Sequence, residues 1–550
     1  MAFVTKSVIV SDPKRGNYSS GQQFHIDIPA SSVPLLSCDQ TYMRCKFKFT
    51  GTNLPIVLND KVGGAALIRS LTVSSIASNT VLEQIDDYNQ LAYVQAHYEN
   101  NESIINKKAL VEGSGSAHSG PAVNLFWATN DTVGATGLYT LGDYKEVELL
   151  LPLSLSGILG QGRNPKVVPI IAMGGLRLTI LLEHNINKIT QAVQLRGDTK
   201  YNETVGFDAT ESGCSLELFT DGQGTQQDLN SATFILANAT DTGLAAGAPI
   251  GVDDVAALRA AIPMYVGMEI YFFDGGDEYY TDNGATIVSV AVNGGRVEIT
   301  LSAPFYGAAG TDIDEGAFIA LAMSTDNAIV NIELSNIELV CSAVQAPAQY
   351  VSSLMSAVKS GLNYDYTTFT NYQVNVNNSI TQSSQYIPLS QQRCLSILSV
   401  PEPIVSLTNR DLAGDGLRPT RPELNYVEPL DYFYLIKNLR TPLRAVDVSR
   451  LNTTYNGADP PAKFAAVHTK ETEDAIEACD FVVRNLDRPD HCFIVARATA
   501  RHGHSFNAQG AGETRLNIRY ATNDINQIFN HFVCHRRRAV IKNNSLVVEV

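Results

Sequence analysis

Alternation of apolar and polar residues predicts β-strands along most of this chain. The clearest case is YMRCKFKF at 42–49, in which every second residue is apolar. Such alternation is typical of a strand with one face in a core and the other in solvent. Further strand patterns lie at 24–28, 67–73, 147–155, 176–182, 366–376, 395–398, 433–436, 493–495 and 516–518. Because little helical pattern separates them, we predict antiparallel sandwiches and not alternating strand–helix units.

The stretch from Asn327 to Gly361 divides the chain into two units. Apolar residues alternate over Val330–Leu334, the phase slips by one residue, and alternation resumes over Ile337–Cys341, which predicts a strand with a bulge. After Pro347, apolar residues recur at helical spacing until Gly361, a residue suited to a helix end. A fresh strand pattern begins directly beyond. We therefore predict two β-domains joined by one short helix.

Two further helices are predicted at similar places in the two units. Residues 81–98 carry apolar residues at helical spacing behind Thr80 and Glu83, which form a capping-box pattern. The second helix lies near 464–477, and the chain closes in a hairpin over 534–550. Because no short fixed period recurs, the chain duplicates a domain plan and is not a solenoid.

Residues 186–326 interrupt the first unit. Within them, strand patterns at 265–273 and at 286–301, the latter turned by an Asn-Gly pair, predict a small β-module. Only two residues of 201–358 are basic. A segment with this charge is poorly suited to nucleic acid or to an anionic membrane, so we interpret it as an insertion that stands out into solvent.

Length and charge narrow the functional classes. At 550 residues the chain is long enough for several folding units, and its formal net charge of −16 argues against a protein whose main task is to bind nucleic acid. The first 20 residues are polar and basic, which predicts an extended arm. They do not resemble a signal peptide, and no apolar run reaches the roughly 18 residues of a membrane span, so we expect synthesis in the cytosol.

The eight cysteines are scattered and include no CxxC pair. This distribution favours free, buried thiols in a reducing compartment over a disulfide framework or a metal site.

No motif in the chain predicts a catalytic, cofactor or metal site. LGQGRNP at 159–165 has only the first part of a dinucleotide fingerprint, without the helix that would hold a phosphate. His502 and His504, like His491 with Cys492, lack a third ligand at suitable spacing. The acidic turn at 312–315 has its glycine one place too early for a calcium loop. We interpret these residues as loop residues.

Two alternatives stay open at this point. Paired carboxylates for glycoside hydrolysis need only proximity in space, so a glycan-binding or glycan-cleaving sandwich is the alternative function, although Trp127 is the one tryptophan available to stack on a sugar. The cluster Arg536–Arg538 is either a solvated strand edge or a contact for an acidic partner or encapsidated nucleic acid.

Two consecutive sandwiches, a helix before the second, a large insertion in the first and no catalytic constellation resemble one family. The chain is similar to the double jelly-roll major capsid proteins of double-stranded DNA viruses, above all those of virophages and polinton-like viruses in the adenovirus and tectivirus lineage. The segments that carry the resemblance are QQFHIDIPASSVPLL before YMRCKFKF, LEQIDDYNQLAYVQAHYE, VELLLPLSLSGILG with PIIAMGGLRLTILLE, LSNIELVCSAV and FVCHRRRAVIKNNSLVVEV.

The resemblance implies an all-β fold of two eight-stranded antiparallel jelly rolls. The corresponding division is an arm at 1–22, a first jelly roll at 23–345 that carries the insertion at about 186–326, a connecting helix at 346–362 and a second jelly roll at 363–550.

The resemblance also implies function. We expect a structural subunit, not an enzyme, that forms homotrimeric, pseudo-hexameric capsomers of an icosahedral virion after synthesis in the host cytosol and assembly inside the infected cell. Its expected partners are other copies of itself, penton and minor capsid proteins and, through an outward-facing insertion, the host surface. The basic arm and the arginine cluster would face inward or toward minor capsid proteins. No sequence-specific nucleic-acid binding, transmembrane segment, cofactor or metal is expected.

Overall fold

The computed structural model describes residues 4–14, 16–50, 56–59, 61–100, 102–114, 146–160, 167–192, 233–236, 268–274, 277–279, 285–293, 296–301, 318–323, 331–404, 427–448, 466–484, 493–500, 506–508, 512–523, 525–542 and 545–549.

Within these residues, eight principal strands form a first sandwich. In chain order they are β1 (Val4–Ser11), β3 (Gln23–Ile28), β4 (Leu36–Thr50), β6 (Ile68–Ser75), β7 (Val81–Asp86), β8 (Val147–Pro152), β10 (Leu176–Leu182) and β18 (Asn331–Gln345). One sheet has the order β1-β18-β4-β8 and the other the order β3-β10-β6-β7. Two short strands, β2 (Tyr18–Ser19) and β9 (Val167–Val168), extend the first sheet. Numbered along the chain, the two orders are 1-8-3-6 and 2-7-4-5.

The second sandwich repeats this arrangement strand for strand. Its strands in the described residues are β19 (Leu362–Val376), β20 (Gln382–Tyr386), β21 (Cys394–Pro403), β22 (Val427–Ile436), β23 (Leu439–Asp447), β24 (Val495–Ala498), β25 (Arg515–Asn523) and β26 (Gln527–Lys542). The sheet orders β19-β26-β21-β24 and β20-β25-β22-β23 are again 1-8-3-6 and 2-7-4-5. A final strand, β27 (Ser545–Glu549), pairs with β26 as the predicted hairpin. Two facing four-stranded sheets in this order form a jelly roll, so the predicted double jelly roll is confirmed.

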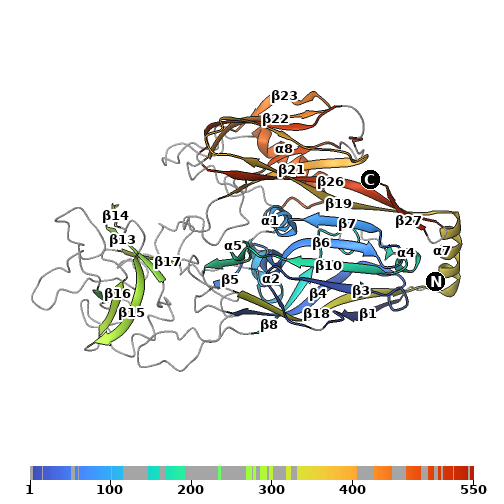
Figure 1. Ribbon diagram of the computed structural model, residues 1–550, viewed down its shortest axis with the longest axis horizontal. Helices are drawn as coiled ribbons and strands as arrows, with labels where there is room; N and C mark the ends of the chain where they lie inside the picture. Colours follow the sequence, from blue (N-terminus) through green and yellow to red (C-terminus); the bar gives the residue numbers. More distant parts are fainter. Residues whose placement is uncertain are drawn as a thin grey trace, which may run out of the picture.

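Helices occupy equivalent connections in the two jelly rolls. In the first, α1 (Tyr88–Glu99) and α2 (Glu102–Glu112) lie between the fifth and sixth strands; in the second, α8 (Ala466–Ala478) does. The predicted linker helix is α7 (Ala348–Ser360), which ends at Gly361 with φ of +115°. Figure 1 shows the two sandwiches side by side, with α7 and both chain ends at one end of the molecule.

The insertion emerges between β10 and β18, the last two strands of the first jelly roll. At its base, α5 (Ile186–Ile189) leads into β11 (Thr190–Ala192), which pairs with β5 (Ile56–Leu58). Its own sheet contains β12 (Thr233–Leu236), β13 (Met268–Asp274), β14 (Asp277–Tyr279), β15 (Ala285–Asn293), β16 (Arg296–Leu301) and β17 (Phe318–Met323). The predicted β-module and its hairpin, formed by β15 and β16, are confirmed. Figure 1 places this module at the opposite end from α7.

The helix predicted at 81–98 is wrong in its first part. Val81–Asp86 is β7, paired with β6, and the helix begins only at Tyr88, after Asp87 has turned the chain at φ of +50°. The capping-box pattern is not used, because Glu83 lies buried in the strand. The apolar residues of this segment fit both the strand period and the helix period. Hydrogen-bonded pairing with β6 makes its first part a strand.

Residues 4–11 are not a separate arm as predicted. They form β1, which pairs with β18 from Val4 opposite Gln345 to Ser11 opposite Glu338. Only Val8, Ile9 and Val10 stand together among polar residues, so the alternation of apolar and polar residues is too weak to predict an edge strand here.

The sheet that contains β26 is buried on both faces. Residues 529–535 of this strand are all buried, although successive side chains of a strand point to opposite sides. Phe529 and Val533 lie in the core of the second jelly roll, whereas Phe532 and Cys534 belong to the larger core that includes the first. The two jelly rolls are therefore packed together through a continuous apolar contact.

Candidate functional site

The junction between the two jelly rolls contains a group of connected polar contacts. Its backbone part is the edge strand β7, which faces the second jelly roll. The carbonyl oxygen of Leu82 accepts hydrogen bonds from the Tyr366 hydroxyl and from Arg537 Nη1, the latter at 3.0 Å. The two donors lie 284 and 455 positions from Leu82 in the sequence. Their hydrogen bonds provide partners for a backbone carbonyl group on an edge strand.

Gly157 allows the backbones of the two jelly rolls to approach closely. A Cβ atom at this position would lie 1.9 Å from the carbonyl oxygen of Thr367, in β19. The turn that carries Gly157 is held by Glu83, whose carboxylate accepts from Ser156 Oγ and, at 3.0 Å, from the Gly157 N–H. Burial raises the pKa of Glu83, although these donors oppose the shift. The position therefore requires a residue without a side chain.

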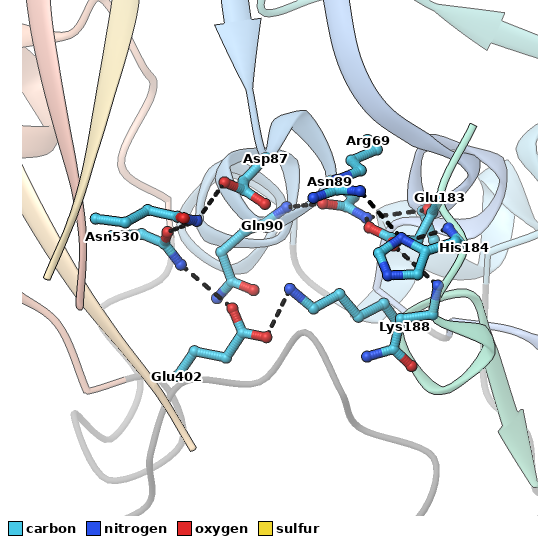
Figure 2. Close-up of polar contacts among 12 residues, drawn as sticks. Arg69, Asp87, Asn89, Gln90, Glu183, His184, Lys188, Glu402 and Asn530 are labelled. Carbon is cyan, nitrogen blue, oxygen red and sulfur yellow. Dashed lines mark hydrogen bonds and ion pairs between the residues drawn. The ribbon is translucent and has the colours of Figure 1, made fainter. Parts of the chain in front are cut away.

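A buried ion pair links the base of the insertion to the second jelly roll. Lys188 Nζ, from α5, lies 2.6 Å from Glu402 Oε1, near the end of β21, and the two side chains are only 11% and 12% exposed. Asn530 Nδ2, from β26, donates to the second oxygen of Glu402 at 3.2 Å. Burial opposes the charge on Lys188, but Glu402 and Asp87 together hold the pKa of Lys188 above its ordinary value. Figure 2 shows the pair between the two domains.

Asp87 extends this polar cluster along the junction. Its Oδ2 accepts from Asn371 Nδ2 and Gln373 Nε2, both at 2.8 Å and both from β19. Burial raises the pKa of Asp87, and Lys188 opposes that shift. Behind it, Asn89 Nδ2 donates to Glu183 Oε2 at 2.9 Å, as Figure 2 shows. The cluster consists of donors matched to carboxylates, an arrangement that fixes the position of the domains.

Two residues of the arginine cluster, Arg537 and Arg538, make contacts within the fold. Arg537 donates to Leu82 across the junction, and Arg538 donates to both carboxylate oxygens of Asp365, from Nε at 2.8 Å and from Nη2 at 3.2 Å. The Arg538 bond holds the pKa of Asp365 below its ordinary value. β26 is an inner strand of its sheet, so the interpretation as a solvated strand edge is wrong, and Arg537 and Arg538 are engaged within the chain.

Most of the other sequence candidates lie outside the described residues. These are 161–165 of the glycine-containing segment, the acidic turn at 312–315, Trp127, His491, Cys492, His502 and His504. Among the residues that the structure describes, no three His, Cys, Asp or Glu side chains form a group that could hold a metal ion. The described helices include none that is long and apolar enough to cross a membrane.

The prediction of buried thiols without a disulfide framework is confirmed for six cysteines of the described residues. They are Cys38, Cys45, Cys341, Cys394, Cys479 and Cys534.

Comparison with known proteins gives matches at the level of structure alone. No protein family and no curated protein matches the sequence. VP54 of PBCV-1, fitted into a reconstruction of the virophage Sputnik, is 8% identical with a TM-score of 0.48, and the match covers 100% of this chain and 97% of that one. The Faustovirus major capsid protein is 6% identical with a TM-score of 0.46, over 98% and 91% of the two chains.

The mavirus major capsid protein is 7% identical with a TM-score of 0.35, over 100% of this chain and 90% of that one. The Faustovirus and mavirus chains are both described as major capsid proteins. The jelly-roll topology of this chain is established independently of them, by its own strand orders.

No pattern along the chain predicted the residues of the junction. Lys188 and Glu402 are separated by more than 200 positions, and neither belongs to a motif. Only the mutual placement of the two jelly rolls brings them together with Asp87. Lys188 directly precedes Ile189, but its other neighbour is the polar Asn187, so the local pattern does not mark this side chain as buried.

Proposed function

We propose that this chain is a major capsid protein, the structural subunit of an icosahedral viral shell. The observation that carries the proposal is the duplicated strand order, 1-8-3-6 and 2-7-4-5, in two jelly rolls of one chain. Three copies supply six similar sandwiches. Closed around a threefold axis, these give a ring with nearly sixfold shape, which suits a tile that must pack against six neighbours.

The junction supports this proposal because a tile must keep its shape. The shared apolar core, the Lys188–Glu402 pair and the close contact at Gly157 hold the two jelly rolls in one orientation. A trimer closes through heterologous contacts, and obligate interfaces of this kind bury about 2,000 Å² or more. Two rigidly joined sandwiches offer broad side faces for such contacts.

The proposed division of the chain follows the earlier boundaries with one change. The first jelly roll extends to residue 345, the connecting helix occupies 346–362 and the second jelly roll 363–550, while residues 4–11 are added to the first jelly roll as β1. The insertion at about 186–326 faces away from the shell, where it is available to the host surface. Neighbouring capsomers, pentons and minor capsid proteins are the other proposed partners, in a virion assembled after synthesis in the host cytosol.

Electron microscopy of the purified chain tests this function. We expect flat particles with six lobes around a threefold axis and, at high concentration, patches of hexagonal tiles. Isolated two-lobed particles at every concentration would contradict the proposal. If these two-lobed particles bind or hydrolyse a glycan, that result would support the glycan-binding alternative instead.

A further inference from the structure

A four-residue bulge protrudes from the outer edge of the second jelly roll. Strand β23 is the edge of the sheet β20-β25-β22-β23. Tyr432 pairs with Val446 and Tyr434 with Thr441, so that Phe433 alone stands opposite four residues of β23. We call these four residues, Pro442–Ala445, the β23 knob.

The knob and its strand carry the most exposed large apolar side chains of the described residues. Leu443, within the knob, is 87% exposed, and Leu439, at the start of the strand, is 71% exposed. Single exposed leucines are common on soluble proteins. Here, however, two of them lie four positions apart on one edge strand, and exposed apolar residues that gather in one place are found at contacts between proteins.

Cations flank these leucines. Arg440 and Arg444 are both exposed, and neither takes part in an ion pair of the described residues. The Arg440 guanidinium lies over the Phe433 ring at 4.1 Å from its centroid, which fixes its direction. The nearest acidic residue on the strand is Asp447, opposite Asp431 of β22. The surface therefore has an exposed arginine next to each exposed leucine, and its nearest carboxylate on the strand lies three residues beyond Arg444.

Protection of the sheet edge explains only part of this surface. A bulge and a proline both prevent another strand from pairing with an edge, and the knob contains both. Such protection is usually completed by charged residues at the most exposed point. Here a leucine occupies that point, so the surface blocks strand pairing while it presents side chains for another kind of contact.

Charge identifies a partner for this surface. The chain has a formal net charge of −16, and residues 201–326 contain nineteen acidic and two basic residues. Because the chain as a whole is negative, its positively charged knob is attracted to the acidic surfaces of other copies of the same chain. Figure 1 shows β22 and β23 on the side of the second jelly roll that faces away from the first jelly roll, and the insertion strands β13–β17 apart from them at one end of the molecule.

We propose that the β23 knob docks onto an acidic surface of a second copy of this chain, with Leu443 buried at the centre and Arg440 and Arg444 facing carboxylates around it. This inference rests on the proposed function, because it names one surface through which the subunits associate. Leucine burial supplies the affinity of the contact, and the arginines restrict its orientation.

Association of a charge-reversed variant tests the inference. Leu443→Glu with Arg444→Glu is expected to weaken self-association about tenfold or more, a loss of the size seen when a central contact is removed. The matched control is Leu110→Glu with Lys107→Glu, which changes an exposed leucine and an exposed lysine of α2 in the same way. Sedimentation velocity over a concentration series measures both, and the thermal midpoint of each variant establishes that it is folded.

Three outcomes are distinct. If the wild type and the control associate and the knob variant does not, the inference is supported. If all three associate equally, the inference is wrong and the capsid proposal stands. If the wild type itself never associates, both are wrong.

A photo-crosslinking residue in place of Leu443 adds a second measurement. Links to peptides of another copy, weakened when salt is raised from about 50 mM to about 500 mM, are expected from a contact with charged neighbours. Links only within one chain would overturn the inference.

Discussion

At the residue scale, Gly157 determines how closely the two jelly rolls can pack. We predict that Gly157→Ala lowers the free energy of unfolding by about 1–3 kcal/mol, the usual cost of an added methyl group that meets rigid atoms, because its Cβ would lie 1.9 Å from the Thr367 carbonyl oxygen. Denaturant unfolding measures this loss. Gly16→Ala is the control, since a Cβ there meets nothing within 4 Å. Equal stability of the two variants would show that the junction is looser than described.

Buried histidines make stability depend on pH. Burial lowers the pKa of His468 from 6.5 to about 4, and that of His531 to about 3. The unfolded chain therefore binds more protons than the folded chain below pH 6.5, so stability falls as the pH falls from 6.5 toward 4.

Replacement of His468 tests this dependence. His468→Gln is expected to remove up to about 3 kcal/mol of the change between those pH values, because one pKa unit corresponds to about 1.4 kcal/mol. Unfolding curves at a series of pH values give the slope. His184→Gln, at a side chain that is 62% exposed, is the control for the loss of an imidazole at the surface. An unchanged slope in His468→Gln would mean that this ring is not the group that titrates.

At the scale of single elements, the bulge in β18 gives the next prediction. The pairing of β18 with β4 shifts register between Ser335 and Glu338, and Asn336 has φ of +47°. Because β-branched residues are strained there, Asn336→Val should lower the unfolding free energy by about 1–2 kcal/mol, whereas Asn336→Gly should be tolerated. Thermal unfolding compares the two. If Asn336→Val unfolds at the same temperature as the wild type, residue 336 does not adopt the positive φ of this bulge.

The ion pair between α5 and β21 gives a prediction with a built-in control. Glu402→Gln leaves the charge of Lys188 buried without its partner, so a loss of about 3 kcal/mol or more is expected. The double variant Lys188→Met with Glu402→Met removes both charges and should lose clearly less. Denaturant unfolding of both variants measures the difference. If the double variant has the lower free energy of unfolding of the two, the ion pair does not account for the stability lost in Glu402→Gln.

The sequence predicted elements well where one local pattern dominates. The β18 bulge follows from a one-residue slip in the apolar alternation, and α7 from the helical spacing between Pro347 and Gly361. Prediction failed at 81–98, because strand β7 and helix α1 share a segment whose apolar residues fit both periods. It failed also at residues 4–11, whose strand is held by its partner β18 and not by its own alternation.

At the scale of the whole molecule, the double jelly roll could be predicted because each sandwich is encoded by its own strand patterns. The junction could not be predicted. Lys188, Glu402 and Asp87 meet only after both jelly rolls have formed and packed, and the contact of Gly157 with Thr367 depends on the same packing. Residues that hold two domains together do not recur at a regular spacing in the sequence. Their contacts are therefore recognised only in the three-dimensional structure.

The central claim is that this chain forms closed trimers of double jelly rolls. The solution mass of the intact chain, measured by light scattering on a sizing column over a range of concentrations, tests it most directly. We predict a discrete species of about three times the 59.6 kDa of one chain, since a threefold ring is a closed assembly. A single species of 59.6 kDa at every concentration would contradict the claim.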